Sequence, residues 1–253
     1  MNFNLNLLTT IILLILIIYF TQIYLKNQFI NNLKYGTVFR DKQIAFNKQK
    51  YKYIDFDDKF LKKNCPSPPK NTSDKTYNEL KFLKNKMKSI NSKKIKLFDD
   101  LDNSADLHFI KFIEDNNLNI DWDEYTILLD EIEQITYKLK YMFNRPRPYQ
   151  LGLYFNLPIR SQYANSGNTP AYPSGHAMLG HMCYLYLGTK YPMHKKKLYE
   201  LAKEVENSRV DVGVHYVSDG NASEKFLQNI FPLIKNKLYK KKNLERSPSD
   251  IVF

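Results

Sequence analysis

Two histidines in separate polar segments are the residues of this 253-residue chain best suited to chemistry. His176 closes "PSGH" (173–176), just before an apolar run, and His215 lies in "SRVDVGVHYVSD" (208–219). Proline, serine and glycine are typical of a helix start, where unpaired amide hydrogens and a partial positive charge favour an anion. A bound anion raises the pKa of a nearby histidine, which can then donate a proton. The first segment therefore predicts an anion site with its own acid.

The second segment adds a candidate nucleophile. Asp219 follows His215 by four residues, which places both on one face of a helix. A carboxylate there can hold one ring nitrogen and leave the other free to attack. Arg209 precedes the histidine by six residues, and its planar guanidinium suits phosphate oxygens.

A third segment, "KLKYMFNRPRPYQ" (138–150), supplies two more cations. Lys140 falls in the last turns of a predicted helix, and Arg147 falls in the loop beyond it. Lys138 with Arg145 fits the same spacing and is an alternative frame. Together the three segments predict a site that binds a tetrahedral oxyanion, where one histidine attacks and the other protonates the departing oxygen.

In that order, K-x6-RP, PSGH and SR-x5-H-x3-D resemble the signature of the type 2 phosphatidic acid phosphatase superfamily. That superfamily also includes the bacterial non-specific acid phosphatases and the vanadium haloperoxidases. The match spans residues 140–219 and agrees at every specified position. The chain has no multi-span apolar core, and in this it is more similar to the soluble acid phosphatases than to the integral lipid phosphatases.

The resemblance implies a role for each matched residue. His215 would form a phosphohistidine intermediate, Asp219 would orient it, and His176 would act as general acid and then activate water. The groups that would hold the phosphate are Lys140, Arg147, Ser174, the Gly175 amide and Arg209. No metal or other cofactor would be needed for hydrolysis. Three further histidines match no motif and are assigned to packing or to the surface: His108, His181 and His194.

The elements that must position these residues have a helical pattern. Apolar residues recur close to every 3.6 positions in 121–143, a stretch that starts with acids and ends with lysines, as the helix dipole favours. Further helical patterns cover roughly 175–190, 195–210 and 215–240, and a long loop covers 149–173. No alternating strand pattern is present. The sequence therefore predicts an all-α bundle of the acid phosphatase and haloperoxidase type.

An uncharged apolar run, Leu7–Leu25, predicts one transmembrane helix at the front of the chain. A cleaved signal peptide is the competing interpretation, but no basic segment precedes the run and no small-residue cleavage site follows it. Lysines and arginines follow the run, which favours a catalytic domain on the cytoplasmic side. The expected organisation is an anchor (1–25), a basic juxtamembrane lead-in (26–74), a helical phosphatase domain (75–240) and a basic tail (241–253).

Composition narrows the functional classes. A hydrophobic content of 43% excludes general disorder, and a net charge of +12 indicates an anionic partner. The leading hypothesis is a phosphomonoesterase that acts on a soluble or lipid phosphate ester. Vanadate-dependent halide oxidation in the same pocket is one alternative. A non-enzymatic basic module that binds anionic lipid or nucleic acid is another, although nucleic acid is not expected because such a module does not explain the motifs. An acidic stretch, "DDLDNSADLHFI" (99–110), lacks the glycine and final acid of a calcium loop and is interpreted as a helix start.

Overall fold

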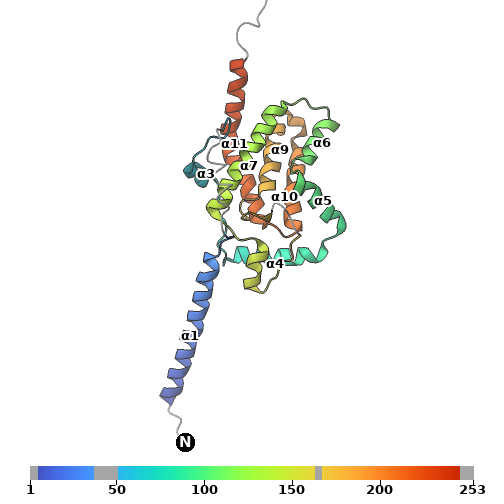
Figure 1. The fold of residues 1–253 in the computed structure, drawn as a ribbon. Helices are drawn as coiled ribbons and strands as arrows, with labels where there is room; N and C mark the ends of the chain where they lie inside the picture. Colours follow the sequence, from blue (N-terminus) through green and yellow to red (C-terminus); the bar gives the residue numbers. More distant parts are fainter. Residues whose placement is uncertain (1–4, 37–50, 163–166, 246–253) are drawn as a thin grey trace, which may run out of the picture.

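Helices form all the regular secondary structure in the ranges that the computed structural model describes, residues 5–36, 51–162 and 167–245. No strand occurs in these ranges, so the all-α prediction is confirmed there. Four long helices form the body of the domain (Figure 1): α7 (Trp122–Phe143), α9 (Gly175–Lys190), α10 (Lys195–Asp211) and α11 (Val217–Glu245). They correspond to the four helices predicted from apolar periodicity.

The central helix of the bundle is α9, which contacts α7, α10 and α11. The buried face of α7 carries apolar residues three and four positions apart: Leu128, Ile132, Ile135 and Leu139. Gly180 allows α9 and α10 to approach closely, since a Cβ at this position would lie 3.3 Å from the Cβ of Val205. The core is therefore built by the apolar stripes that the sequence displays.

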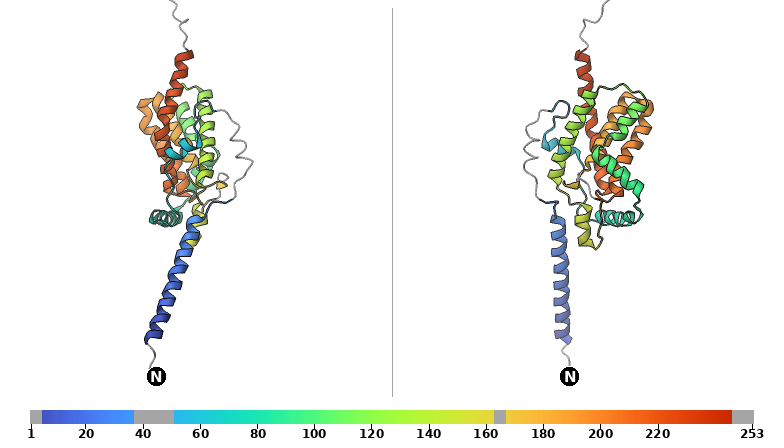
Figure 2. Two further views of the ribbon diagram at one scale, coloured as in Figure 1. Left: turned by 90° about the vertical axis from the view of Figure 1, so that its left-hand side faces the viewer. Right: turned by 45° about the vertical axis from the view of Figure 1, so that its right-hand side comes forward.

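The bundle brings the ends of its long helices together. Because α9 and α11 run opposite to α7 and α10, α7 and α10 end where α9 and α11 begin (Figure 1). The amide of Ser174, just before α9, donates to the Asp219 carbonyl in the first turn of α11 at 3.1 Å. This end of the bundle is also the end from which α1 (Leu5–Asn32) projects (Figures 1 and 2).

Shorter helices cover this end and the sides. The helices α5 (Ser92–Asn103) and α6 (Leu107–Asp115) pack against α10, and α4 (Asp74–Lys86) lies across the end near α1 (Figure 1). The predicted loop 149–173 begins instead with two short helices, α8 (Pro148–Gly152) and η2 (Leu153–Phe155). Pro148 is the first residue of α8, where its missing amide hydrogen costs nothing, and Gln150 accepts from the Arg147 amide at 2.8 Å.

The second half of the predicted lead-in belongs to the domain. Tyr53 and Ile54 are buried, and both of their amides donate to the Glu131 carboxylate of α7, at 2.9 and 2.8 Å. The short helix α3 (Asp58–Asn64) packs against α7 and α11. Residues 37–50, the middle of the lead-in, and residues 246–253 of the basic tail lie outside the described ranges.

The helix α1 is long and apolar enough to cross a membrane. Its 28 residues span about 42 Å, and the most apolar 18-residue stretch within Leu7–Asn32 has a mean hydropathy of 2.3 and is not buried. It continues past the predicted end at residue 25, and Ile30 is buried near Leu80 and Leu151. Asn71 donates to the carbonyls of Ile30 and Leu33, at 2.8 and 3.0 Å. The end of α1 is therefore part of the folded domain, which argues for a retained helix.

Candidate active site

Lys140 lies in the last turn of α7 and points inward. The helix ends at Asn144, which adopts the left-handed conformation with φ 49°, just before a proline-containing segment. The ammonium of Lys140 is buried and donates to the Pro170 carbonyl at 2.6 Å. Burial and the positive charges of Arg147 and Arg209 hold the pKa of this lysine well below its usual value.

Arg147 stands immediately before α8, and its guanidinium is buried among loop carbonyls. Its Nε donates to the Thr169 carbonyl, and one terminal nitrogen donates to the Val214 carbonyl, both at 2.8 Å. The same terminal nitrogen lies 2.9 Å from Nε2 of His215. One cation is thus fixed directly against the candidate nucleophile.

The start of α9 carries the PSGH segment. Ser174 is the N-cap, and its hydroxyl accepts from the Ala177 amide at 3.5 Å, so the side chain caps the helix. A Cβ on Gly175 would lie 3.7 Å from Cε of Lys140, which shows how closely the helix start and the lysine approach. His176 follows, with Nε2 3.7 Å from a carboxylate oxygen of Asp102. The partial positive charge of the helix start therefore faces the lysine and the histidine.

His215 and Asp219 form the pair that their spacing predicts. The Nδ1 atom of His215 lies 3.0 Å from Oδ2 of Asp219, and the Tyr216 amide donates to the same oxygen at 3.0 Å. Because the Arg147 guanidinium can only donate, Nε2 of His215 must be the acceptor, and the ring proton must lie on Nδ1, facing Asp219. The ring thus keeps a lone pair on the nitrogen that faces the cations.

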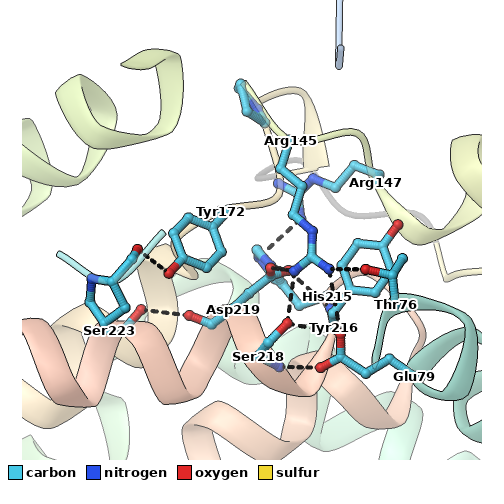
Figure 3. Close-up of polar contacts among 12 residues, drawn as sticks. Thr76, Glu79, Arg145, Arg147, Tyr172, His215, Tyr216, Ser218, Asp219 and Ser223 are labelled. Carbon is cyan, nitrogen blue, oxygen red and sulfur yellow. Dashed lines mark hydrogen bonds and ion pairs between the residues drawn. The ribbon is translucent and has the colours of Figure 1, made fainter. Parts of the chain in front are cut away.

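A second buried arginine supports Asp219 from behind (Figure 3). The Arg145 guanidinium donates to Oδ1 of Asp219 at 2.6 Å and to the Ser218 hydroxyl at 2.8 Å, and it lies 3.4 Å from Glu79. Its carbon is 3.8 Å from the centre of the Tyr216 ring. Burial raises the pKa of Asp219 to about 6, although Arg145 and the Tyr216 amide oppose that rise.

Arg209, in the last turn of α10, is held by a carboxylate. Its guanidinium lies 4.1 Å from the centre of the Phe98 ring, and one terminal nitrogen donates to Asp102 at 2.5 Å. Burial lowers the pKa of Arg209 to about 10, so the side chain remains a cation at neutral pH. Asp102 thus contacts two predicted site residues, Arg209 and His176.

A cavity of about 70 Å³ lies where these segments meet. Its lining includes five of the eight predicted site residues: Lys140, Arg147, Gly175, His176 and His215. The other three adjoin the lining residues without facing this cavity: Ser174 caps α9, Arg209 is bound to Asp102, and Asp219 lies behind His215. A wider pocket of about 380 Å³ shares Glu133, His176 and Leu179 with the cavity, and its further lining includes Asp102, Asp106 and Asp130.

The charges around the cavity favour an anion. Burial and the cations Arg147, Lys140 and Arg209 hold the pKa of His215 well below its usual value. Burial and Arg209 lower the pKa of His176 to about 3, although the Asp102 carboxylate opposes the change. Both rings are therefore neutral at pH 7 while the cavity is surrounded by positive charge. A phosphate would offset that charge and make protonation of His176 easier.

Residues 125–224 match the family model of the PAP2 superfamily, and this range contains all eight predicted site residues. No curated protein matches the chain. A transmembrane PAP2-type phosphatidylglycerolphosphate phosphatase from Bacillus subtilis is similar in its crystal structure, with 18% identity, coverage of 68% of this chain and 89% of that chain, and a TM-score of 0.47.

Within the segment that matches this family model, the structure separates the two frames of the first motif. Lys140 and Arg147 line the cavity, whereas the Lys138 ammonium lies over the Tyr51 ring, 5.0 Å from its centre. Arg145 binds Asp219 instead of facing the cavity. The histidines assigned to packing or surface lie elsewhere: His108 pairs with Glu204, His181 pairs with Glu206, and His194 stacks edge-on against Phe112.

Sequence reasoning missed two residues that position the site, Asp102 and Arg145. Asp102 lies in the acidic stretch 99–110, and no spacing in that stretch connects it to Arg209. Arg145 fits the first motif only as the alternative to Arg147, which gives it no role of its own in the site. The segment "RPRP" does contain a signal for Arg145: two arginines lie two residues apart, and each of them precedes a proline.

Proposed function

We propose that this chain hydrolyses phosphate monoesters, with His215 as the nucleophile. The observation that carries the proposal is the His215 ring, whose Nδ1 contacts the buried Asp219 carboxylate while Nε2 contacts Arg147 at the cavity. The match of residues 125–224 to the PAP2 superfamily model supports a phosphatase-type activity. The phosphohistidine step and the monoester preference are inferred from the residues.

Substrate binding would use the positive charges around the cavity. Lys140 and Arg147 both face the cavity, and the start of α9 adds its amides at Gly175. Arg209 would complete the set by turning one of its donors toward a phosphate oxygen. When a phosphate enters, Arg147 would donate to its oxygens rather than to His215, which frees the Nε2 lone pair. The same donors would stabilise the charge on the equatorial oxygens in the transition state.

In the first step, Nε2 of His215 would attack phosphorus, and the bond from phosphorus to the ester oxygen would break. His176, protonated in the substrate complex, would give its proton to the departing oxygen, so the alcohol leaves neutral. In the second step, His176 would take a proton from water as the water oxygen attacks phosphorus. The phosphorus–nitrogen bond would then break, which releases inorganic phosphate and restores the His215 lone pair.

Asp219 would act by position and charge. It keeps the proton on Nδ1 and balances the positive charge that the ring gains when Nε2 bonds to phosphorus. Arg145 in turn fixes the carboxylate, with a donor 2.6 Å from Oδ1. Cations from side chains supply the charge that a metal ion provides in other phosphatases, so we expect activity to persist in a chelator.

The direct test is phosphate release by the full chain in detergent, with p-nitrophenyl phosphate and phosphatidic acid as separate soluble and lipid substrates. We expect His215→Ala to lose release from every substrate that the wild type cleaves. His108→Ala is the matched control, because His108 is a partly exposed histidine that pairs with Glu204 away from the cavity. A denaturing alkaline quench during turnover should trap a phosphate on the wild type only, and later treatment with acid should release it, because a phosphorus–nitrogen bond is stable to base and labile in acid. Release by His215→Ala at the wild-type rate would exclude the proposed nucleophile.

We also propose a single-pass membrane protein with its domain on the cytoplasmic side. The proposal depends on the exposed apolar span of α1 and on the distribution of basic residues around it. Lys26 and Lys34 follow the apolar run, and no lysine or arginine precedes the run in the sequence. Asn71 begins an Asn-Thr-Ser glycosylation triplet, but its amide nitrogen is used in bonds to α1. Protease added to intact cells or spheroplasts should leave the domain undigested. Digestion without lysis would reverse the assigned orientation.

A further inference from the structure

The C-terminal end of α1 is attached to the same region of the domain as α4 and α8. Ile30 packs in a cluster with Leu80 of α4 and Leu151 of α8. Tyr35 extends the attachment, since its amide donates to the Asn144 carbonyl at 3.1 Å and its carbonyl accepts from Gln150 at 2.9 Å. These contacts fix the position of α4 and α8 relative to the point where α1 leaves the domain (Figures 1 and 2).

Beside this point, large apolar side chains are exposed on α1, η2 and α4. Leu153 is 64% exposed, and aromatic residues of α1, α4, α8 and η2 are exposed as well: Phe29, Tyr77, Phe82, Tyr149 and Tyr154. The Phe29 and Tyr154 rings are 5.7 Å apart, and the Tyr77 and Phe155 rings are 5.8 Å apart. The apolar surface of α1 therefore continues onto η2 and from there onto α4.

The exposed face of α4 combines aromatic rings with lysines. Leu80 and Leu83 are buried, while Tyr77, Lys81 and Phe82 on the other face are exposed. The Lys81 ammonium lies 5.7 Å from the centre of the Tyr77 ring. Aromatic rings and lysines on one exposed helix face are typical of helices that lie at the head-group layer of a membrane, where the rings enter the interface and the lysines meet anionic lipid.

We propose that this surface, formed by Phe29, the exposed face of α4 and the η2 residues Leu153 and Tyr154, rests on an anionic lipid bilayer. The bilayer is the occupant that the position of α1 favours, and this choice rests on the proposed single-pass anchor. The apolar surface of α1 is unburied up to Phe29, and the next residue, Ile30, is buried in the domain. A bilayer that encloses α1 must therefore end at about this level, where Phe29 touches Tyr154.

This contact would orient the domain as well as tether it. A single flexible anchor leaves a domain free to tilt, whereas a second contact beside the anchor sets its orientation. The ends of α7 and α10 and the starts of α9 and α11 would then face the membrane-proximal side. The surface does not include any predicted site residue, and the proposal does not depend on the proposed catalytic activity.

The test measures lipid contact at chosen residues of the full chain in phosphatidylcholine–phosphatidylglycerol vesicles that carry a spin-labelled quencher lipid. An environment-sensitive fluorophore is attached in Leu153→Cys, with Tyr24→Cys in α1 as the positive control. Met193→Cys is the negative control, since Met193 is 85% exposed in η4 (Pro192–His194) at the opposite end of the domain. Cys65 and Cys183 are free and buried, and burial raises the pKa of Cys65 to about 12, so background labelling should be small.

We expect the quencher lipid to remove emission at positions 24 and 153 and to leave position 193 unchanged. Lys81→Glu should reduce quenching at position 153 and leave position 24 unaffected. If position 24 is quenched while position 153 behaves like position 193, the surface does not touch lipid and the proposal is wrong. Absence of quenching at position 24 also overturns it, because α1 is then not enclosed by the bilayer. Protection of position 153 that depends on protein concentration and not on lipid would assign the surface to a second copy of the chain.

Discussion

Replacement of Asp219 by asparagine should abolish most of the proposed activity while the shape of the cavity changes little, because Asp219 does not line it. The introduced side chain has one acceptor and one donor in place of two acceptors. Its oxygen should stay with Arg145, because that charged donor lies 2.6 Å from Oδ1 and forms the strongest of the contacts. Its amide group then faces Nδ1 of His215 and the Tyr216 amide, where the native Oδ2 accepts from both.

The changed contact reverses the tautomer of His215. An amide donor opposite Nδ1 requires that nitrogen to accept, so the ring proton moves to Nε2 and the lone pair no longer faces the cavity. The same tautomer error lowers kcat by about 10⁴ when the aspartate of a serine-protease triad becomes asparagine. We expect Asp219→Asn to lower kcat by about 10³ to 10⁴, which corresponds to about 4 to 5.5 kcal/mol. KM should change little, since Asp219 does not line the cavity.

The assay is phosphate release from p-nitrophenyl phosphate at saturating substrate, with helicity and thermal melting measured on the same samples. The matched control is Glu206→Gln, which changes another buried His–carboxylate contact, 2.8 Å from His181 and away from the cavity. Both variants should lose stability, by up to about 3–5 kcal/mol for a broken buried pair. Only Asp219→Asn should lose kcat beyond its folded fraction. A folded Asp219→Asn protein with kcat within threefold of the wild type would refute the tautomer argument.

Three further predictions concern the proton on His176, a strained turn and the end of α1. The protein should take up a proton when phosphate binds at pH 5–6, because His176 is neutral above pH 3 in the free protein and a bound anion raises its pKa. Calorimetry in buffers of different ionisation enthalpy should show this uptake, and His176→Gln should lose it. Gly213→Ala should lower the free energy of unfolding by about 1–2 kcal/mol in denaturant titrations, since Gly213 has φ +74° and a Cβ would lie 2.6 Å from the Met87 sulfur; an unchanged midpoint would contradict this. Asn71→Ala should lower the melting temperature in detergent, with a loss of about 1–3 kcal/mol, because two carbonyls at the end of α1 lose their donor; equal melting would mean that these bonds do not hold the helix.

The helices with a stripe of apolar residues are the part of the fold that can be predicted from the sequence. The stripe of α7 includes Leu128, Ile132 and Leu139, and all three are buried. Residues 51–65 fall in the predicted lead-in, because they contain many charged residues and their apolar residues do not recur at helical spacing. Their burial depends on Glu131, whose carboxylate accepts the amides of residues 53 and 54, 78 and 77 positions away along the chain. Such a contact has no local sequence signal.

The same distinction applies to the site. The His215–Asp219 contact is local, four residues apart at the start of a helix, and its spacing predicts it directly. Asp102 contacts Arg209 across 107 residues, and Arg145 contacts Asp219 across 74. Only the packing of α5 against α10, and of the segment after α7 against α11, brings these pairs together. Motifs therefore identify the groups that face the cavity, while the groups that hold them become visible only in the folded chain.

The two arginines of "RPRP" show how the sequence builds both layers from one short segment. A proline restricts the preceding residue to extended backbone, and Pro146 and Pro148 therefore hold Arg145 and Arg147 extended; Arg147 has φ −69° and ψ 157°. Residues two apart in extended backbone point to the same side. Both guanidinium groups accordingly reach the start of α11, one to the Asp219 carboxylate and one to Nε2 of His215 (Figure 3). The apparent ambiguity between two motif frames thus reflects two arginines that hold opposite ends of one histidine–carboxylate pair.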